Sequence, residues 1–304
     1  MYPKRLSDRI TVLGNHYLQT YLVEGDGMTM LIEPGISATA TQVVRQMRSA
    51  HIDPLTIDRL FLTHAHGDHI TGGPILKRAM PQLVVTASPE TTRLLKKKKV
   101  RQIFIRDDHD TGVRLKQLGA TTESPAPDLN ESLNGLVEVH VAPGQIMDLG
   151  GLSVVVMDAP GHCIGGVALW VPEEKVLFCS DYLGFFLPPD QFVPNFYVDL
   201  EDYMATFDTL AQLDADWICP GHCGVYTGEA RRRFIEQSRA EIEWVRHRVT
   251  EGRTGPDAGE GLQEALFERY YVREATMFSE HSTRYCMDLI IRRIMDITRT
   301  EADA

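Results

Sequence analysis

The stretch Thr63-His64-Ala65-His66-Gly67-Asp68-His69 decides the fold and the chemistry of this chain. It places three imidazoles and one carboxylate close together, and both are common ligands of zinc and iron. A single His-x-His pair is weak evidence, but four candidate ligands at this spacing are hard to explain otherwise. Residues 57–63 predict a buried strand and residues 70–74 lead into a helix. The ligands therefore lie on a strand-to-helix loop, where binding groups concentrate.

Three further candidate ligands follow at wider spacing. His162 stands in Ala-Pro-Gly-His-Cys, Asp181 in Phe-Cys-Ser-Asp-Tyr, and His222 in Cys-Pro-Gly-His-Cys. Each comes just after a short run with strand character. Together with the four residues of the first stretch, they are enough for two metal ions that share one carboxylate.

The order His-x-His-x-Asp-His, then His, Asp and His, resembles the motif of the metallo-β-lactamase superfamily of binuclear metallohydrolases. The resemblance covers residues 10–225. It implies an αββα sandwich, in which two mixed β-sheets are flanked by helices and the metals lie at one edge. It also implies ligand roles: His64, His66 and His162 for one metal, Asp68, His69 and His222 for the other, and Asp181 as the bridge.

One ligand departs from the best-known subclass of true β-lactamases. Those enzymes carry a Cys in the second metal site, where this chain has an Asp. The difference argues against an antibiotic as the substrate and favours the other hydrolase branches.

Composition agrees with an enzyme of one large domain or two moderate ones. The chain has 304 residues and a net charge of −11, from 31 basic and 42 acidic side chains, so a polyanion such as nucleic acid is repelled. No apolar run is long enough for a membrane helix, and no signal sequence is expected. Five cysteines without paired spacing suit a reducing compartment, so we expect a cytoplasmic protein.

The pattern along the chain predicts two parts. Residues 1–225 form the catalytic domain, with an irregular helical insertion at 96–135 that lies over the site. Residues 226–304 form a helical domain that covers the active site. Within the insertion, 107–110 (Asp-Asp-His-Asp) is expected to be a solvated acidic loop, with a cation site as the alternative. The four lysines at 96–99 are expected to be solvated, with attraction of an anionic substrate as the alternative.

This layout resembles glyoxalase II enzymes and the pseudomonad quinolone-signal response thioesterase. The resemblance implies a metal-bridging hydroxide that attacks a thioester or related ester, for instance an acyl-CoA, because two metal ions lower the pKa of a shared water. Asp68 orients the hydroxide and Asp181 tunes both ions. Zinc is the first expectation for the two divalent ions, and iron or manganese remain open. We expect substrate contacts from five side chains: Tyr182, Phe186, Phe196, His281 and Ser282.

Other functions remain open at this point. A mononuclear iron persulfide dioxygenase shares much of the motif, and a lactone or phosphodiester hydrolase uses the same metals. A regulatory binding protein with a secondary hydrolase site is a third alternative. The last helices also offer a face for a homodimer.

Overall fold

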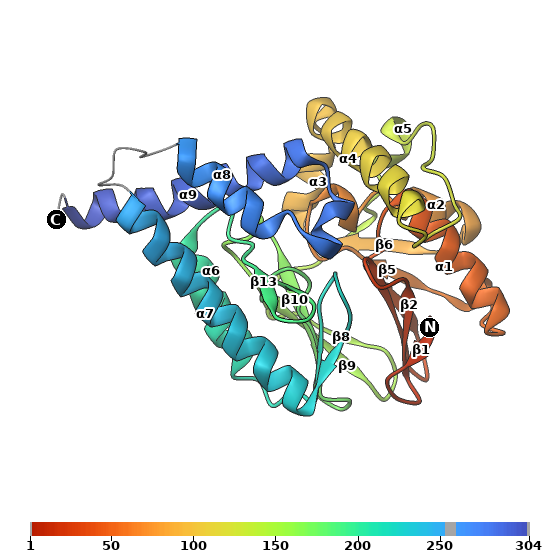
Figure 1. Ribbon diagram of the computed structural model, residues 1–304. Helices are drawn as coiled ribbons and strands as arrows, with labels where there is room; N and C mark the ends of the chain where they lie inside the picture. The colour runs from red at the N-terminus through yellow and green to blue at the C-terminus, as the bar shows by residue number, and fades with distance from the viewer. Residues whose placement is uncertain (1, 253–259, 303–304) are drawn as a thin grey trace.

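The computed structural model describes residues 2–252 and 260–302 and shows two β-sheets packed face to face between layers of helices (Figure 1). The helices α1 (Ser37–Ser49), α2 (Gly73–Ala79) and α4 (Lys98–Gln117) lie on one side of this sandwich. The helices α6 (Leu200–Ala211) and α7 (Gly228–Gly252) lie on the other. The predicted αββα fold is therefore confirmed.

The first sheet has the strand order β1-β2-β3-β4-β5-β6-β7. Its first four strands are antiparallel, and β4 to β7 are parallel. The bounds are β1 (Lys4–Arg5), β2 (Ile10–Gly14), β3 (Gln19–Glu24), β4 (Thr29–Ile32), β5 (Arg59–Phe61), β6 (Val84–Ala87) and β7 (Val139–His140). The parallel strands are joined by α1, by α2, and by the helices between β6 and β7, as right-handed crossover units require.

The second sheet has the order β15-β14-β11-β10-β9-β8. All neighbours are antiparallel except β11 and β14, which are parallel. The bounds are β8 (Ile146–Asp148), β9 (Ser153–Asp158), β10 (Val167–Val171), β11 (Val176–Phe178), β14 (Trp217–Cys219) and β15 (Tyr226–Thr227). A separate hairpin, β12 (Phe185–Leu187) and β13 (Gln191–Val193), was not predicted, because its aromatic residues were interpreted as a loop.

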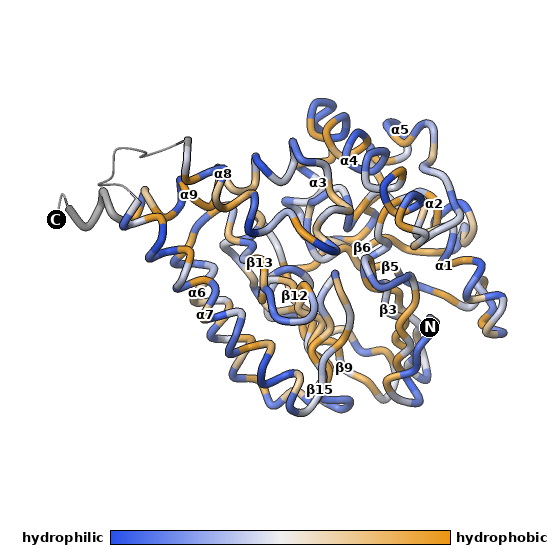
Figure 2. The backbone as a smooth tube through the Cα atoms, in the orientation of Figure 1, coloured by the Kyte–Doolittle hydropathy of each residue, from blue (hydrophilic) through white to orange (hydrophobic). Residues whose placement is uncertain are grey.

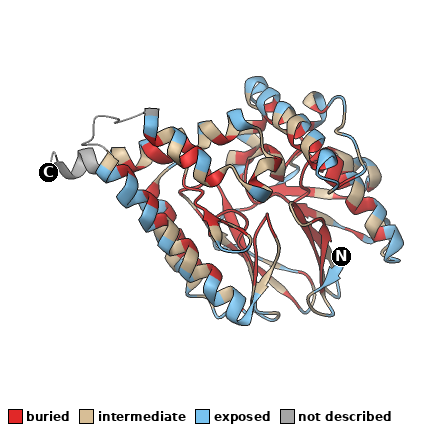
Figure 3. Cartoon of the chain, in the orientation of Figure 1, coloured by how far each residue is buried: buried red, intermediate tan, exposed pale blue. Residues whose placement is uncertain are grey.

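The core between the sheets follows from strand alternation. Residues of one face of β2, such as Ile10 and Val12, pack against residues of the opposite sheet, such as Val154 and Val156 of β9. These side chains are fully buried, and the strands are hydrophobic in Figure 2 and buried in Figure 3. The outer faces of the two sheets bury two further clusters beneath their helices. Each sheet is thus packed on both faces, and the loops at their edges begin from buried strands.

The insertion at 96–135 is more regular than expected. It consists mainly of α4, a helix of 20 residues, followed by the short helix α5 (Asn130–Leu133). The prediction of a solvated acidic loop at 107–110 is wrong, because all four residues lie within α4. Asp108 is buried, and its carboxylate accepts hydrogen bonds from the backbone N–H and the hydroxyl of Ser37, at 2.7 Å each.

The chain after β15 is helical in the described residues, as predicted. Helix α7 is followed by α8 (Glu260–Tyr270), a 3₁₀ turn (Arg273–Met277) and α9 (Glu280–Ala302). The predicted break at 252–261 lies almost wholly outside the described residues. These helices share one hydrophobic cluster with the second sheet and with β12 and β13. The division into two domains stays a prediction.

None of the helices within residues 2–252 and 260–302 is both long and apolar enough to cross a membrane.

Candidate metal centre

Strand direction brings the predicted ligands to one edge of the sandwich. In the second sheet, β9 and β11 are both antiparallel to β10, and β14 is parallel to β11. These three strands therefore run the same way, and His162, Asp181 and His222 follow their carboxyl ends. The stretch from His64 to His69 follows β5 of the first sheet. Loops from both sheets thus meet at the same edge.

The first group of ligands consists of His64, His66 and His162. The Nε2 atom of His64 lies 3.1 Å from Nδ1 of His66 and 3.3 Å from Nε2 of His162, and the latter two atoms are 3.0 Å apart. A tetrahedral zinc ion with bonds of 2.0–2.1 Å places its ligand atoms about 3.3 Å from each other. The three nitrogens therefore have the spacing of a metal site.

The second group consists of Asp68, His69 and His222. The two Nε2 atoms of the histidines are 3.2 Å apart. Oδ2 of Asp68 lies 3.3 Å from Nε2 of His222 and 3.5 Å from Nε2 of His69. This is again the spacing of ligands around one ion.

Asp181 lies between the two groups. Its Oδ2 atom is 3.6 Å from Nε2 of His162 in the first group and 3.6 Å from Nε2 of His69 in the second. Its Oδ1 atom is buried, and no hydrogen bond reaches it from the described residues. Burying a carboxylate oxygen without a partner is costly. A cation on each side of Asp181 removes that cost, so the donor set fits two ions that share this carboxylate.

Backbone carbonyls fix the orientation of two of the histidines. Nδ1 of His162 donates to the carbonyl of Asn195, and Nδ1 of His222 donates to the carbonyl of Tyr17 at 3.0 Å. A carbonyl only accepts hydrogen bonds, so each Nδ1 carries the proton. Each Nε2 then presents a lone pair to the cluster, which is how protein histidines are prepared for metal binding.

Glu33 is a member of the site that sequence reasoning missed. It follows β4, the strand next to β5, and is buried with a backbone φ of +60°. Its Oε1 accepts a hydrogen bond of 2.7 Å from the hydroxyl of Thr63 and lies 3.3 Å from Nδ1 of His69. A carboxylate on the far nitrogen orients a ligand histidine and raises its basicity. Its position at the end of a strand that neighbours the ligand strand was the available signal.

The pKa values separate the two groups. Burial, followed by the neighbouring histidines, lowers the pKa of His64 well below its usual value, and burial with His66 lowers the pKa of His162 to about 3. Burial acts in the same direction on His69, but the carboxylates of Asp68 and Glu33 outweigh it and raise the pKa of His69. The first group is therefore kept neutral, as metal ligands must be, and the second is surrounded by negative charge.

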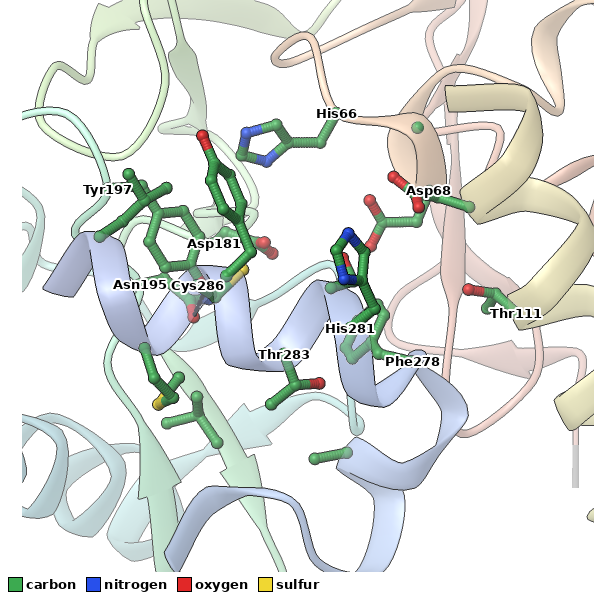
Figure 4. A pocket seen from close by; sticks show the side chains of 18 of the residues that line it. His66, Asp68, Thr111, Asp181, Asn195, Tyr197, Phe278, His281, Thr283 and Cys286 are labelled. Atoms are coloured by element: carbon green, nitrogen blue, oxygen red, sulfur yellow. Dashed lines mark hydrogen bonds between the residues drawn. The ribbon is translucent and has the colours of Figure 1, made fainter. Parts of the chain in front are cut away.

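A cavity of about 500 Å³ opens onto the cluster (Figure 4). His66, Asp68 and Asp181 lie on its floor. Helix α4 forms one wall, and α9 with the preceding turn forms another. Of the predicted substrate contacts, His281 and Ser282 line this cavity, and Figure 4 shows the His281 ring directed from α9 towards Asp68. The volume is in the range of small-molecule sites.

The other three predicted contacts lie elsewhere. Tyr182 is fully buried behind the ligands, with its hydroxyl 3.4 Å from the carbonyl of Thr63. Phe196 is fully buried against Tyr203. Phe186 packs on the ring of Phe192.

The aromatic side chain that does line the cavity from β12 is Phe185, the immediate neighbour of Phe186. Successive residues of a strand point to opposite faces. The unpredicted hairpin therefore turns Phe186 away from the cavity and Phe185 into it.

Residues 15–222 match the protein family described as the Metallo-beta-lactamase superfamily. The chain is 25% identical over 255 residues to the "Beta-lactamase-like protein 2 homolog" of Caenorhabditis elegans, across 81% of this chain and 69% of that protein. It is also 25% identical over 177 residues to a "Hydroxyacylglutathione hydrolase" of Methylococcus capsulatus, across 58% of this chain. The aligned part spans only half the length of that enzyme.

Solved structures with the same fold are similar over most of the chain. A metallo-beta-lactamase family protein from Thermus thermophilus has a TM-score of 0.63 at 18% identity, across 93% of this chain and 95% of that one. At this identity the likeness concerns the fold alone.

Proposed function

The chain belongs to the metallo-beta-lactamase superfamily, and we propose that it is a binuclear metal-dependent hydrolase of a thioester or related ester with an apolar acyl group. The family and the His/Asp cluster indicate a metal-dependent hydrolase. The observation that carries the finer proposal is the cavity, in which the ligand cluster faces apolar walls. Such a combination of a few polar groups with apolar lining is typical of sites for small organic substrates.

In this proposal each group of ligands holds one metal ion. His64, His66 and His162 would hold one divalent ion, and Asp68, His69 and His222 the other, with Asp181 shared between them. Nitrogen-rich sets with one or two carboxylates suit zinc best, and iron and manganese also accept them. When bound, the ions supply a nucleophilic water at neutral pH and polarise the carbonyl that it attacks.

The ligand side chains also orient the attacking water and limit the access of bulk water. The Asp68 side chain is 18% exposed and lines the cavity, so its carboxylate is placed to accept a hydrogen bond from the attacking water and to orient it. Apart from His66, which is partly exposed, the other ligands are almost fully buried, which keeps bulk water away from their side chains. A site that excludes water strengthens the electrostatic interactions on which the reaction depends.

The lining of the cavity favours an apolar acyl group. The walls carry Ile103 and Phe104 from α4, Phe185 from β12, Phe278, and Met287 from α9. Burying apolar surface contributes about 0.8 kcal/mol per CH₂ group, whereas burying an unpaired hydroxyl is unfavourable. An aryl or medium-chain acyl group therefore suits this cavity better than a small hydroxyacyl group.

An acyl-CoA is one form that this substrate can take. The four lysines at 96–99 are exposed at the start of α4, and the inner face of the same helix lines the cavity. A substrate whose acyl group enters the cavity alongside α4 leaves its phosphates outside, where the lysines attract them.

The test is hydrolysis of a panel of esters by protein reconstituted with zinc, iron or manganese. The panel contains the CoA and glutathione thioesters of acetate, octanoate and benzoate, a lactone and a phosphodiester. We expect turnover of the octanoyl and benzoyl thioesters, abolished in His66→Ala and retained in His109→Ala, since His109 lies exposed on α4. Hydrolysis that survives His66→Ala would contradict the metal site, and oxygen uptake with a persulfide would favour the dioxygenase instead.

A further inference from the structure

The proposed hydrolysis also needs a proton for the departing group. We infer that the carboxyl of Asp107 on α4 protonates the leaving group as its bond to the acyl carbon breaks, so that the site hydrolyses oxygen esters as well as thioesters. This inference rests on the proposed function. The first observation behind it is the position of Asp107, which lines the same cavity as His66 and Asp68 but belongs to neither ligand group.

Packing fixes that position. Helix α4 lies directly on the loop that carries the ligands, because a Cβ atom at Gly67 would be 3.2 Å from the backbone of Phe104. Asp107 follows Phe104 by three residues, so the two side chains share one face of the helix. Phe104 is buried against the loop, and Asp107 reaches the cavity one turn further along. Any shift of the Asp107 backbone relative to the ligands would require α4 to separate from the loop.

The surroundings of Asp107 suit a proton donor. Its side chain is only 29% exposed, and the Arg106 guanidinium is 3.8 Å away, beyond hydrogen-bonding distance. The pKa of Asp107 is raised to about 6. Burial is the main cause, Arg106 and His281 oppose the rise, and the charges of Asp68 and Asp110 add to it. Groups that transfer protons work best when their pKa lies near the working pH.

The cavity also fixes which end of the substrate Asp107 meets. Among its most deeply buried lining residues are the apolar Phe185 and Val193, each about 5% exposed or less, which mark its inner end. Its mouth is open, since Ile103 is 39% and Tyr285 59% exposed. An apolar acyl group takes the inner end, and the leaving group points to the mouth. Asp107, of intermediate exposure, lies along that path.

The step balances without any further reactant. Water adds to the carbonyl carbon through its oxygen and releases one of its protons to solvent, and the electron pair of the breaking C–O bond passes to the departing oxygen. That oxygen takes the proton of the Asp107 carboxyl and leaves as an alcohol. The acid product stays behind, and the Asp107 carboxylate regains a proton from solvent at the mouth.

Leaving-group chemistry makes the role measurable. A thiol has a pKa near 8.5, so a thiolate departs readily without help. An alcohol is a far weaker acid, with a pKa close to that of water at 15.7, so its departure as the bare anion is slow. Proton transfer of this kind typically contributes 10²–10⁴-fold. The contribution of Asp107 should therefore be large for alkyl esters and small for thioesters.

The experiment compares three esters of the same acid on zinc-loaded protein: ethyl octanoate, the S-ethyl thioester and p-nitrophenyl octanoate. For Asp107→Asn we expect kcat/KM to fall about 100-fold or more on the ethyl ester and less than about 5-fold on the other two. The control is His109→Ala, on the same helix, where the side chain is 67% exposed. It should keep rates near those of the wild type. Metal content is measured for each variant.

The outcomes separate the inference from the proposed function. An equal loss on all three esters, or none on the ethyl ester, would overturn the role of Asp107 as a proton donor. Wild-type protein that hydrolyses the thioester but not the ethyl ester would overturn the inference and leave the proposed function standing. Wild-type protein that hydrolyses none of the three would overturn both.

Discussion

Replacing Gly221 by alanine tests how the second group of ligands is built. A Cβ atom at this position would lie 2.5 Å from Cε1 of His69, 2.9 Å from Oε2 of Glu33 and 3.2 Å from Oδ1 of Asp181. The backbone of Gly221 lies outside the left-handed region, so alanine introduces no backbone strain there. The effect of the substitution therefore comes from the added methyl group alone.

The size of the effect follows from these distances. Carbon atoms approach to about 3.5–4.0 Å at their best separation, so the imidazole of His69 must retreat by about 1 Å. Metal–ligand bonds tolerate about 0.2 Å. His69 then no longer reaches an ion shared with Asp68 and His222. Disturbing even the partners that orient a ligand costs about 10–100-fold in metal affinity, and displacement of the ligand itself should cost at least as much.

The assay is metal content after dialysis against a chelator of graded strength. We expect two ions per wild-type chain and one per Gly221→Ala chain, because His64, His66 and His162 remain in place. Gly27→Ala is the control, since its Cβ would meet its nearest neighbour at an ordinary 3.6 Å. Two ions bound with unchanged affinity in Gly221→Ala would refute the arrangement of the second group.

Three further predictions follow from single contacts. Glu33→Gln should weaken metal binding about 10–100-fold in a chelator competition, because the carboxylate that faces Nδ1 of His69 loses its charge. Metal-free Asp107→Asn should melt at a higher temperature than the wild type above pH 6 and at the same temperature below pH 4. The folded protein raises the pKa of Asp107 to about 6, so the ionised carboxyl destabilises the wild type at high pH, whereas below pH 4 the carboxyl is neutral in both the folded and the unfolded chain. Calorimetry across this range checks it, and a constant difference would contradict it. Glu241→Ala should lower the free energy of unfolding by about 2 kcal/mol in urea, because its side chain, 12% exposed, makes two hydrogen bonds with Arg269; an unchanged midpoint would contradict this.

The ligand cluster could be predicted from the sequence because the motifs that carry its residues are short and local. The stretch from His64 to His69 carries four donors on one loop, and the three later donors each follow a short run with strand character. The fold then only had to bring strand ends to one edge, which the directions of β5, β9, β11 and β14 accomplish. The structure places all seven side chains together, and their roles as ligands stay a prediction.

The cavity was harder to predict, because it depends on register and on distant packing. One residue of strand register decides whether Phe185 or Phe186 faces the cavity. The turn residues Pro188-Pro189-Asp190 between the two strands were the available signal for the hairpin, but they do not fix its register. Asp107 was interpreted as a loop residue because its segment is polar. The helical face shared by Phe104 and Asp107 becomes meaningful only when α4 packs on Gly67. Glu33 was missed because a lone carboxylate at a strand end has no pattern of its own.

The metal ligands and the walls of the cavity also differ in how much can be inferred about them from similar proteins. The ligands all lie within residues 15–222, the region that matches the family, and they come from loops at the edges of the sheets. The walls that meet the substrate include α9, beyond that region, together with α4. A shared metal centre therefore predicts how a bond is attacked and says little about which bond. For this chain we therefore expect the choice of substrate to depend on the side chains that α4 and α9 present to the cavity. This is why variants of Asp107, measured against esters with different leaving groups, discriminate between substrates better than any change to a metal ligand.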